Sequence, residues 1–413
     1  MNTYKPYSKM RAFLFLLIVV LIAGLFVIFI PRVFSSTPQN VFFLNQNFNS
    51  VAKNDIIPYL QFMETQWVSS QLQIKALNKN FLVDKKALSI QWDLSRIKKD
   101  LLNRKNENQQ VPIYFSWDEK KVEEAFRFIA EKTNLFPQDA LIKNGRIIRS
   151  KTGYRLNLTS AIEETRQGIS QGLNKIVIKS FDVLPPAIDT KQLLQSLGFQ
   201  YLLAHFETSL LEKDENTRFN IDKGAKSIDG YILEKGEIFS FNKMVGPANK
   251  NDGYLETKVV VNGKLAPGYG GGICQVSSTL YNALLQCDAK IIERSPHSGY
   301  SEDTSYVNPG LDAAVSFGYK DLKFSFPHQP TAIFTYIEND RLIAEIWGEN
   351  ECFDSKSIIS KIQKITNHGD SDAFIEVETI VSTNGSIEKR YKDTYLVPIE
   401  YAQILKEQKD KKQ

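Results

Sequence analysis

An uninterrupted apolar stretch near the N-terminus constrains the fold of this chain more than any other feature. It runs from Ala12 to Ile30 without a charged or polar side chain. As an α-helix it would be about 28 Å long, close to the thickness of the hydrocarbon core of a bilayer. The competing interpretation is a cleaved signal peptide, whose apolar core would be shorter, about 7–15 residues, and would end at small residues. We therefore expect one uncleaved transmembrane helix.

The charges around this stretch predict its orientation. Three basic residues precede it and only Arg32 follows closely. Because cytoplasmic flanks are enriched in Lys and Arg, residues 1–34 are expected to form a cytoplasmic N-terminus and a transmembrane anchor. Residues 35–50 are rich in Ser, Asn and Gln and read as a linker. The sequence thus predicts a single-pass protein of the cell membrane, with the bulk of the chain extracytoplasmic.

The length and charge of the chain limit its partners. The 413 residues leave room for two or three domains, and the formal net charge is only +4. The sequence contains no zinc-finger pattern, no RNA-binding signature and no long basic run. Nucleic acid is therefore not an expected partner.

Residues 51–186 alternate between helical and strand-like patterns, which predicts an α+β domain. Its lysines Lys85, Lys86, Lys98 and Lys99 are expected to form a solvated helix face, with glycan binding as the alternative. The expected elements are a helix over Trp92–Leu102, a strand over Val111–Trp117, a hairpin over Ala140–Arg149 turning at Asn144–Gly145, a helix opened by a capping box at Ser160, and a strand over Lys175–Val183.

A second α+β domain is expected over residues 198–327, followed by a β-rich extension over residues 328–413. Two hairpins are predicted in this extension, one over 331–347 and one over 374–391 with its turn at Asn384–Gly385. They either extend the sheet of the preceding domain or form a small separate module. The last residues, Lys406 to Gln413, are polar and expected to be frayed.

The most specific motif runs from Gly268 to Ala283. Three consecutive glycines, Gly270, Gly271 and Gly272, are followed by Ile273 and then Cys274. A helix N-terminus stabilises a thiolate, and glycines let backbone N–H groups turn toward a carbonyl or an anion. The motif therefore predicts a nucleophile beside an oxyanion hole at the start of a helix.

A helical wheel separates two cysteines of this segment. Cys287 falls on an apolar stripe with Val276, Leu280, Ala283 and Leu284, which predicts a buried side chain. Cys274 falls on the opposite side, with Ser278 and Tyr281. Together with Cys352 the chain has three cysteines, which argues against a disulfide framework. We treat all three as free thiols, with a Cys287–Cys352 bridge as the alternative.

Cys274 needs a base if it is a nucleophile. His297 is the nearest histidine and follows a predicted strand, and either Asp312 or Asp321 could orient it. The alternative is a ligand-binding groove lined by Gly270, Gly271, Gly272, Gln275, Ser277, Ser278 and Tyr281. A third interpretation is structural, with the glycines serving tight packing and His297 satisfied locally. No paired-ligand spacing predicts a metal, and no cofactor is expected.

The order of these motifs closely resembles the VanW family. The resemblance covers about 130 residues and rests on Ile228-Asp-Gly230, Glu237–Asn242, Val245-Gly-Pro247, Gly270–Asn282, Pro296-His-Ser298 and Gly310–Val315. It implies a link to the bacterial envelope and to glycopeptide-resistance clusters, but no particular activity.

The preceding region resembles the peptidoglycan-binding-like domain found before VanW domains. That resemblance rests on Phe81–Leu88, Phe136–Ala140, Asn144-Gly-Arg146 and Lys151-Thr-Gly153. Together the two resemblances imply an interaction with peptidoglycan or its peptide stems, in cell-wall maintenance or in a glycopeptide response. The alternative function is that of a thiol-dependent hydrolase or transferase, acting on amide bonds of cell-wall peptides through Cys274.

Overall fold

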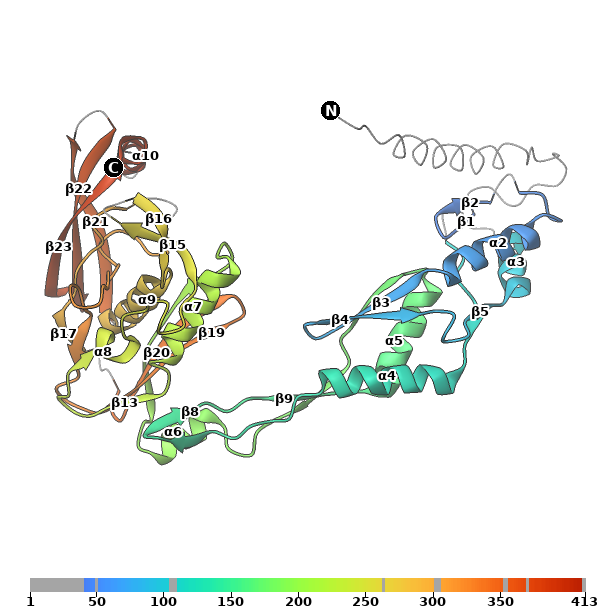
Figure 1. The fold of residues 1–413 in the computed structure, drawn as a ribbon, viewed down its shortest axis with the longest axis horizontal. Helices are drawn as coiled ribbons and strands as arrows, with labels where there is room; N and C mark the ends of the chain where they lie inside the picture. Colours follow the sequence, from blue (N-terminus) through green and yellow to red (C-terminus); the bar gives the residue numbers. More distant parts are fainter. Residues whose placement is uncertain are drawn as a thin grey trace, which may run out of the picture. The chain divides into compact units, whose positions relative to one another are not determined.

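The computed structural model describes residues 41–48, 51–103, 110–261, 264–300, 306–351, 356–368 and 371–410. The predicted transmembrane segment, Ala12 to Ile30, lies outside these residues. Among the helices that are described, none is both long and apolar enough to cross a bilayer. The chain divides into two compact units (Figure 1). The first ends at Leu184, and the second comprises residues 138–151 and 185–413. Both contain helices and strands, which confirms the predicted α+β class.

The first unit is built around a small three-stranded sheet. Strand β3 is central, parallel to β10 and antiparallel to β4, and its alternate residues Leu72, Ile74 and Ala76 are buried. Helices α4 and α5 contribute Phe126, Ile129 and other apolar residues to one continuous core. The elements are β1 (Phe42–Phe43), β2 (Gln46–Asn47), α2 (Ile56–Val68), β3 (Gln71–Ala76), β4 (Lys79–Asp84), β5 (Gln91–Trp92), α3 (Leu94–Asn103), β6 (Phe115–Ser116), α4 (Glu119–Thr133), β9 (Gly153–Leu156), α5 (Leu158–Ser170), β10 (Lys175–Ile178) and β11 (Phe181–Leu184).

Three expectations for the first unit are wrong in detail. The strand predicted over 111–117 shrinks to β6, and the strand predicted over 175–183 is two strands, β10 and β11. Helix α5 begins earlier than predicted, because the side chain of Asn157, not Ser160, accepts the capping hydrogen bond. Ser160 instead donates its backbone N–H to this cap.

Lys85 does not lie on the solvated helix face that was expected from the sequence. Its side chain is fully buried, with the ammonium group over the ring of Trp67. The ammonium also donates to Trp67 O at 3.0 Å, to Ser70 Oγ at 2.7 Å and to Asn174 Oδ1. Burial lowers the pKa of Lys85 to about 8. The charge pattern did not reveal this position because its partners are distant in sequence.

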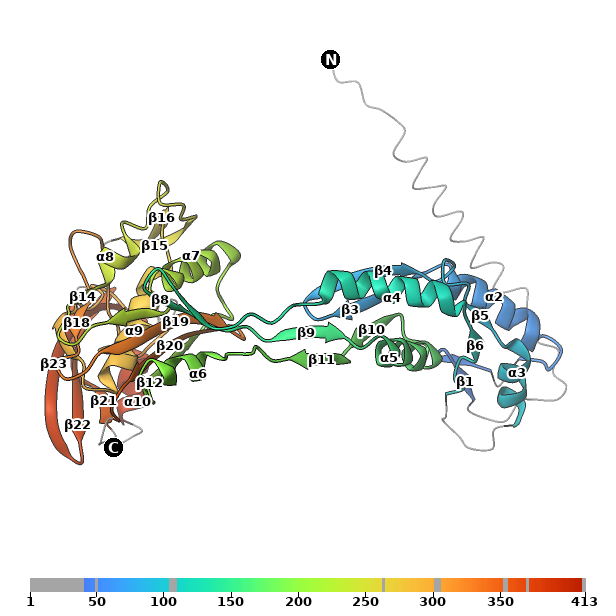
Figure 2. The same cartoon turned by 90° about the horizontal axis from the view of Figure 1, so that it is seen from below.

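The second unit is organised by a six-stranded antiparallel sheet in the order β12-β20-β19-β13-β8-β7. Helices α7 and α9 share one core with one face of this sheet, and α6 contributes Leu194 to a second cluster with Phe334 (Figure 2). The predicted turn is confirmed between β7 and β8, where Asn144 and Gly145 both have positive φ, 52° and 72°. The hairpin β19–β20 belongs to this sheet, which is therefore continuous across the boundary predicted at 327.

The C-terminal residues form a separate three-stranded antiparallel sheet, β21-β22-β23, with its turn at Asn384–Gly385 as predicted. A helix, α10, follows where a frayed end was expected. The elements of the second unit are β7 (Leu141–Lys143), β8 (Arg146–Ile148), α6 (Thr190–Ser196), β12 (Tyr201–Ser209), α7 (Glu215–Lys226), β13 (Tyr231–Leu233), β14 (Phe239–Ser240), α8 (Phe241–Val245), β15 (Glu256–Val261), β16 (Lys264–Tyr269), α9 (Ile273–Leu285), β17 (Lys290–Glu293), β18 (Lys323–Ser325), β19 (Thr331–Glu338), β20 (Arg341–Gly348), β21 (Lys356–His368), β22 (Asp372–Thr383), β23 (Ser386–Pro398) and α10 (Ile399–Asp410).

Candidate functional site

Helix α9 places Cys274 at its second position. Gly272 is the N-cap and has a φ of +101°, a left-handed conformation that favours glycine. Cys274 is partly exposed, and every residue from Gln275 to Leu285 is buried. Cys274 and Cys287 are both free thiols, and Cys287 is buried as predicted. Cys352 lies outside the described residues.

The side of α9 opposite the apolar stripe is buried as well. Ser278 and Tyr281 on this side are fully buried, because the chain before and after Asp312 covers them. Ser278 Oγ accepts from the backbone N–H of Ala313 at 2.9 Å, and the ring of Tyr281 meets that of Tyr391 edge to face. Helix α9 is therefore packed on all sides, and only its first turn reaches the surface.

The thiol of Cys274 interacts with the imidazole of His297. Burial by itself would raise the pKa of this thiol, but the hydrogen bond and the positive charge of His297 outweigh it and lower the pKa of Cys274. The sulfur also lies 3.5 Å from the carbonyl oxygen of Val315. The sulfur is therefore next to an acceptor for its proton, and the net effect of its surroundings is a lowered pKa of Cys274.

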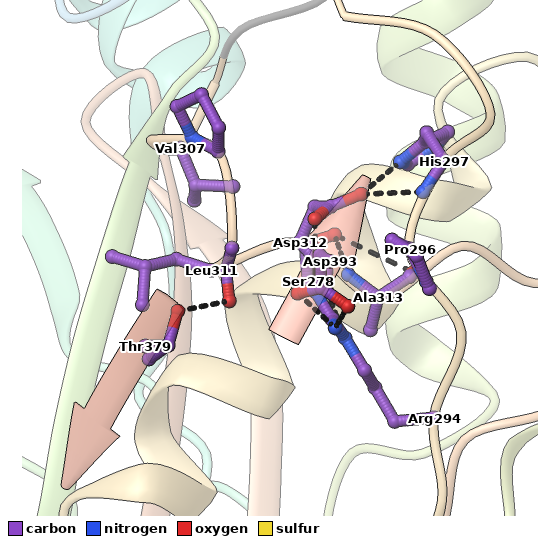
Figure 3. A network of polar contacts seen from close by, with 12 residues as sticks. Ser278, Arg294, Pro296, His297, Val307, Leu311, Asp312, Ala313, Thr379 and Asp393 are labelled. Atoms are coloured by element: carbon purple, nitrogen blue, oxygen red, sulfur yellow. Dashed lines mark hydrogen bonds and ion pairs between the residues drawn. The ribbon is translucent and has the colours of Figure 1, made fainter. Parts of the chain in front are cut away.

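His297 is held by Asp312 (Figure 3). The Nδ1 atom lies 2.6 Å from Asp312 Oδ2, and the backbone N–H of His297 donates to the same oxygen at 2.7 Å. This leaves Nε2 to face Cys274. Burial acts to lower the pKa of His297, but its bonds to Asp312 and Cys274 raise it to about 10. The imidazole is thus protonated near neutral pH, beside a thiol whose pKa is lowered.

The two aspartates left open by the sequence have different roles. The side chain of Asp312 is only 3% exposed, and although burial acts to raise its pKa, its bond to His297 and the charge of Arg294 give a net lowering. Asp321 instead accepts from Ser240 Oγ at 2.6 Å and from Asn242 N at 2.9 Å, where it supports the start of α8. Asp312 is therefore the residue that orients His297.

The glycines before α9 are explained by close packing. A Cβ at Gly271 would lie 2.1 Å from Thr257 Oγ1, and one at Gly270 would lie 2.5 Å from the carbonyl oxygen of Ala248. A Cβ at Gly272 would meet Ile221 at 2.6 Å. These are contacts that no Cβ makes without a shift of its neighbours. A ligand-binding role for the three glycines stays a prediction.

The polar side chains of α9 are used inside the protein. Gln275 Nε2 donates to Thr208 Oγ1 at 2.9 Å and to Ser209 O at 3.0 Å. Ser277 Oγ donates to the carbonyl oxygen of Ala313 at 2.6 Å. Both side chains are buried, as are those of Ser278 and Tyr281. Their predicted contact with a ligand likewise stays a prediction.

Sequence reasoning missed four residues of this network: Arg294, Tyr306, Asp393 and Tyr395. Tyr306 is hydrogen-bonded to Ser278, and burial and the charge of Cys274 both raise its pKa. Arg294 and Tyr395 bond Asp312 Oδ1 at 2.9 Å and 2.6 Å. The position of Arg294 at the end of the strand predicted over 290–294 was the one available signal. Asp393 and Tyr395 lie about 80 residues or more beyond Asp312, and nothing in their local sequence marked them.

The assembled residues have the chemistry of a thiol nucleophile with its base. In this arrangement Cys274 corresponds to the nucleophile, His297 to its base, and Asp312 to the carboxylate that orients the base. In the part of the chain that the structure describes, no group of three or more His, Cys, Asp or Glu residues is placed to hold a metal ion. The arrangement is suited to acyl transfer through a thioester.

Comparison with known proteins supports the family suggested by the motifs. Residues 216–347 match the family model described as VanW like protein. The chain is 32% identical over 225 residues to "Uncharacterized protein YoaR" of Bacillus subtilis (strain 168), an alignment that covers 54% of this chain and 72% of that protein. The chain belongs to the VanW family.

A second VanW relative carries a functional name. The chain is 34% identical over 140 residues to "Vancomycin B-type resistance protein VanW" of Enterococcus faecalis (strain ATCC 700802 / V583), which covers 33% of this chain and 51% of that protein. No solved structure matched the chain. The VanW match contains Cys274, His297 and Asp312, but it ends before Asp393 and Tyr395. The peptidoglycan-binding-like domain over residues 51–186 and the other domain boundaries stay predictions.

Proposed function

We propose that this VanW-family protein is a thiol-dependent enzyme that cleaves or transfers an amide bond of a cell-wall peptide. The observation that carries the proposal is that His297, held by Asp312 at 2.6 Å, lowers the pKa of the Cys274 thiol. The same three residues were candidates from sequence, yet they come from three separate segments.

The reaction proceeds in two steps. The Cys274 thiolate attacks the carbonyl carbon of the amide, and the tetrahedral intermediate collapses to a thioester as His297 gives its proton to the leaving amine. Water or a second amine then attacks the thioester, and His297 takes up the proton of that nucleophile. Water completes a hydrolysis, and an amine completes a transfer.

The backbone at the start of α9 is suited to stabilise the oxyanion. The N–H of Ile273 bonds Gly270 O at 3.3 Å, and that of Gln275 bonds Gly272 O at 2.9 Å. The N–H of Cys274 lies between them, in the first turn, where a helix offers no internal acceptor. We assign this N–H as a donor to the oxyanion.

The substrate class follows from the proposed location and from the relatives. We infer that residues 12–30 anchor the chain and that the site faces the cell wall. The name of the Enterococcus relative, a vancomycin resistance protein, supports a role in the bacterial envelope. Peptidoglycan and its peptide stems are then the amide-containing polymer within reach, and interaction with them is part of the proposed function.

The test uses purified sacculi and two cysteine variants. We expect the wild-type protein and Cys274→Ala to be retained by sacculi, and only the wild type to change the muropeptide profile measured by liquid chromatography and mass spectrometry. Cys287→Ala is the matched control and should retain activity, because Cys287 is buried in the core. If sacculi retain both proteins and the muropeptide profiles are identical, the protein binds the cell wall without acting on it, and the proposed enzymatic function is refuted. Absence of retention would refute the substrate class.

A further inference from the structure

The carboxylate of Asp312 divides its two oxygens between different partners. Oδ2 accepts from His297, through Nδ1 and the backbone N–H. Oδ1 accepts from Arg294 Nη2 at 2.9 Å and from the hydroxyl of Tyr395 at 2.6 Å. One oxygen is thus anchored while the other faces the imidazole. A carboxylate anchored in this way cannot rotate about its Cβ–Cγ bond without losing both anchors.

Arg294 joins Asp312 to the C-terminal sheet (Figure 3). Its Nη1 lies 2.6 Å and 2.5 Å from the two carboxylate oxygens of Asp393, on β23. Its Nε donates to the carbonyl oxygen of Asp312 at 2.6 Å. The side chains of Arg294, Asp312 and Asp393 are 4%, 3% and 6% exposed. Charges buried to this degree stay only where they are paired, so the guanidinium is fixed by Asp393 as firmly as it fixes Asp312.

Tyr395 ties the backbone next to Asp312 to the same strand. Its hydroxyl accepts from the N–H of Gly310 at 2.7 Å while donating to Asp312. Thr379 Oγ1, on β22, donates to the carbonyl oxygen of Gly310 at 3.1 Å. Gly310 has a φ of +88°, and a Cβ there would lie 2.4 Å from Thr379 Oγ1. The segment that carries Asp312 is thus fitted closely against the C-terminal sheet.

We propose that Asp393 and Tyr395 of strand β23 are positioning residues for the reaction at Cys274, acting through Arg294 and Asp312 on His297. The C-terminal sheet is then a working part of the site, although these two residues lie outside the VanW match. This inference rests on the proposed function. It adds that the orientation of Asp312 is set from β23, more than 80 residues away along the chain.

The experiment measures the alkylation of Cys274 by iodoacetamide across pH, followed by mass spectrometry of the peptide that contains it. The variants are Tyr395→Phe and Asp393→Asn, and the matched control is Thr394→Ala, whose side chain is exposed between them on β23. Each protein is first checked for a cooperative thermal transition by circular dichroism, so that only folded protein is compared.

We expect Tyr395→Phe to alkylate about 10-fold more slowly near neutral pH, the factor typical of one hydrogen bond to a charged group. The midpoint of its pH profile should move toward that of an ordinary thiol. The alkylation rate and the pH midpoint of Asp393→Asn should change in the same direction, and Thr394→Ala should keep the wild-type profile. Wild-type profiles in both folded variants overturn the inference, and so does an equal loss in Thr394→Ala, which would indicate a merely structural effect.

The wild-type protein and His297→Ala separate this inference from the proposed function. Faster alkylation of wild-type Cys274 than of glutathione, lost in His297→Ala, supports the thiol–imidazole pair whatever the β23 variants do. If wild-type Cys274 reacts no faster than glutathione, the proposed function fails and this inference fails with it.

Discussion

Replacing Asp312 by Asn tests the electrostatic reasoning about the site most directly. Burial acts to lower the pKa of His297, but Asp312 and Cys274 together raise it to about 10, against an ordinary value of about 6.5. With a pKa of 10, the imidazole is about 99.9% protonated at pH 7, whereas at 6.5 it would be about 24% protonated. Because His297 is buried, the loss of the carboxylate should lower its pKa from about 10 toward the ordinary value, with Cys274 as the remaining group that raises it.

The amide introduced by Asp312→Asn would also impose the wrong tautomer. With its oxygen kept on Arg294 and Tyr395, the amide presents its NH₂ group to Nδ1 of His297, so the imidazole proton moves to Nε2. That nitrogen then no longer accepts a proton from Cys274. A comparable change in the serine proteases lowers kcat by about 10⁴, so we expect a loss of about 10³ to 10⁴ in muropeptide turnover.

Alkylation by iodoacetamide gives a readout that needs no substrate. An ordinary thiol with a pKa of about 8.5 is only about 3% thiolate at pH 7, so a thiol returned to that pKa would alkylate about 30-fold more slowly than a full thiolate. A gain in intrinsic nucleophilicity as the pKa rises makes the measured loss smaller. The pH midpoint of alkylation is the more reliable measure, and it should rise in Asp312→Asn.

Asp321→Asn is the matched control. It removes an equally buried carboxylate from the same domain, but one bonded to Ser240 and Asn242. Both variants should be destabilised by about 1–3 kcal/mol, since each leaves buried donors without a charged acceptor. Only Asp312→Asn should change the alkylation of Cys274. An unchanged alkylation midpoint in folded Asp312→Asn would refute the role given to this carboxylate.

Three further predictions concern pH, packing and the first unit. Turnover should rise as Cys274 loses its proton, at a pH below the ordinary thiol pKa, and fall as His297 loses its proton near pH 10; a profile rising steadily through pH 10 would exclude the imidazolium as the acid. Gly271→Ala should destabilise the protein by about 1–3 kcal/mol, measured by urea unfolding, because its Cβ would displace Thr257. Lys85 has a folded-state pKa of about 8, below its unfolded value of about 10.5. The unfolded state therefore binds the extra proton in this window, and stability should rise with pH from 8 to 10.5 relative to Lys85→Met. Parallel pH profiles of the two proteins would contradict the burial of this charge.

The sequence alone predicted which residue types form the candidate site, but not how these residues are arranged in space. Cys274 was singled out because a glycine run ahead of a helix is a local pattern, and a local pattern can be recognised from the sequence alone. The hairpins at Asn144–Gly145 and Asn384–Gly385 were predicted for the same reason, since two residues with positive φ define the turn. His297 was chosen by proximity in sequence, and the partner aspartate was left open between two candidates.

The tertiary structure decided what long-range packing controls. Helix α9 has one apolar stripe by its sequence, yet it is buried on every side because the segment around Asp312 and strand β23 cover its polar face. The choice of Asp312 over Asp321 also depends on which loop segments meet, and periodicity carries no information on that. Arg294, Asp393 and Tyr395 were missed because a buried ion pair is formed by residues distant in sequence.

The sequence thus determined a thiol at a helix start, an apolar N-terminal segment and an α+β chain of the VanW family. Only the folded chain determined that the thiol meets an imidazole, and that this imidazole is held by a carboxylate anchored from the C-terminal sheet. The physical reason is that a nucleophile is identified by its own side chain and its neighbours in sequence. Its pKa and its base are set by charges and hydrogen bonds that only tertiary packing brings together.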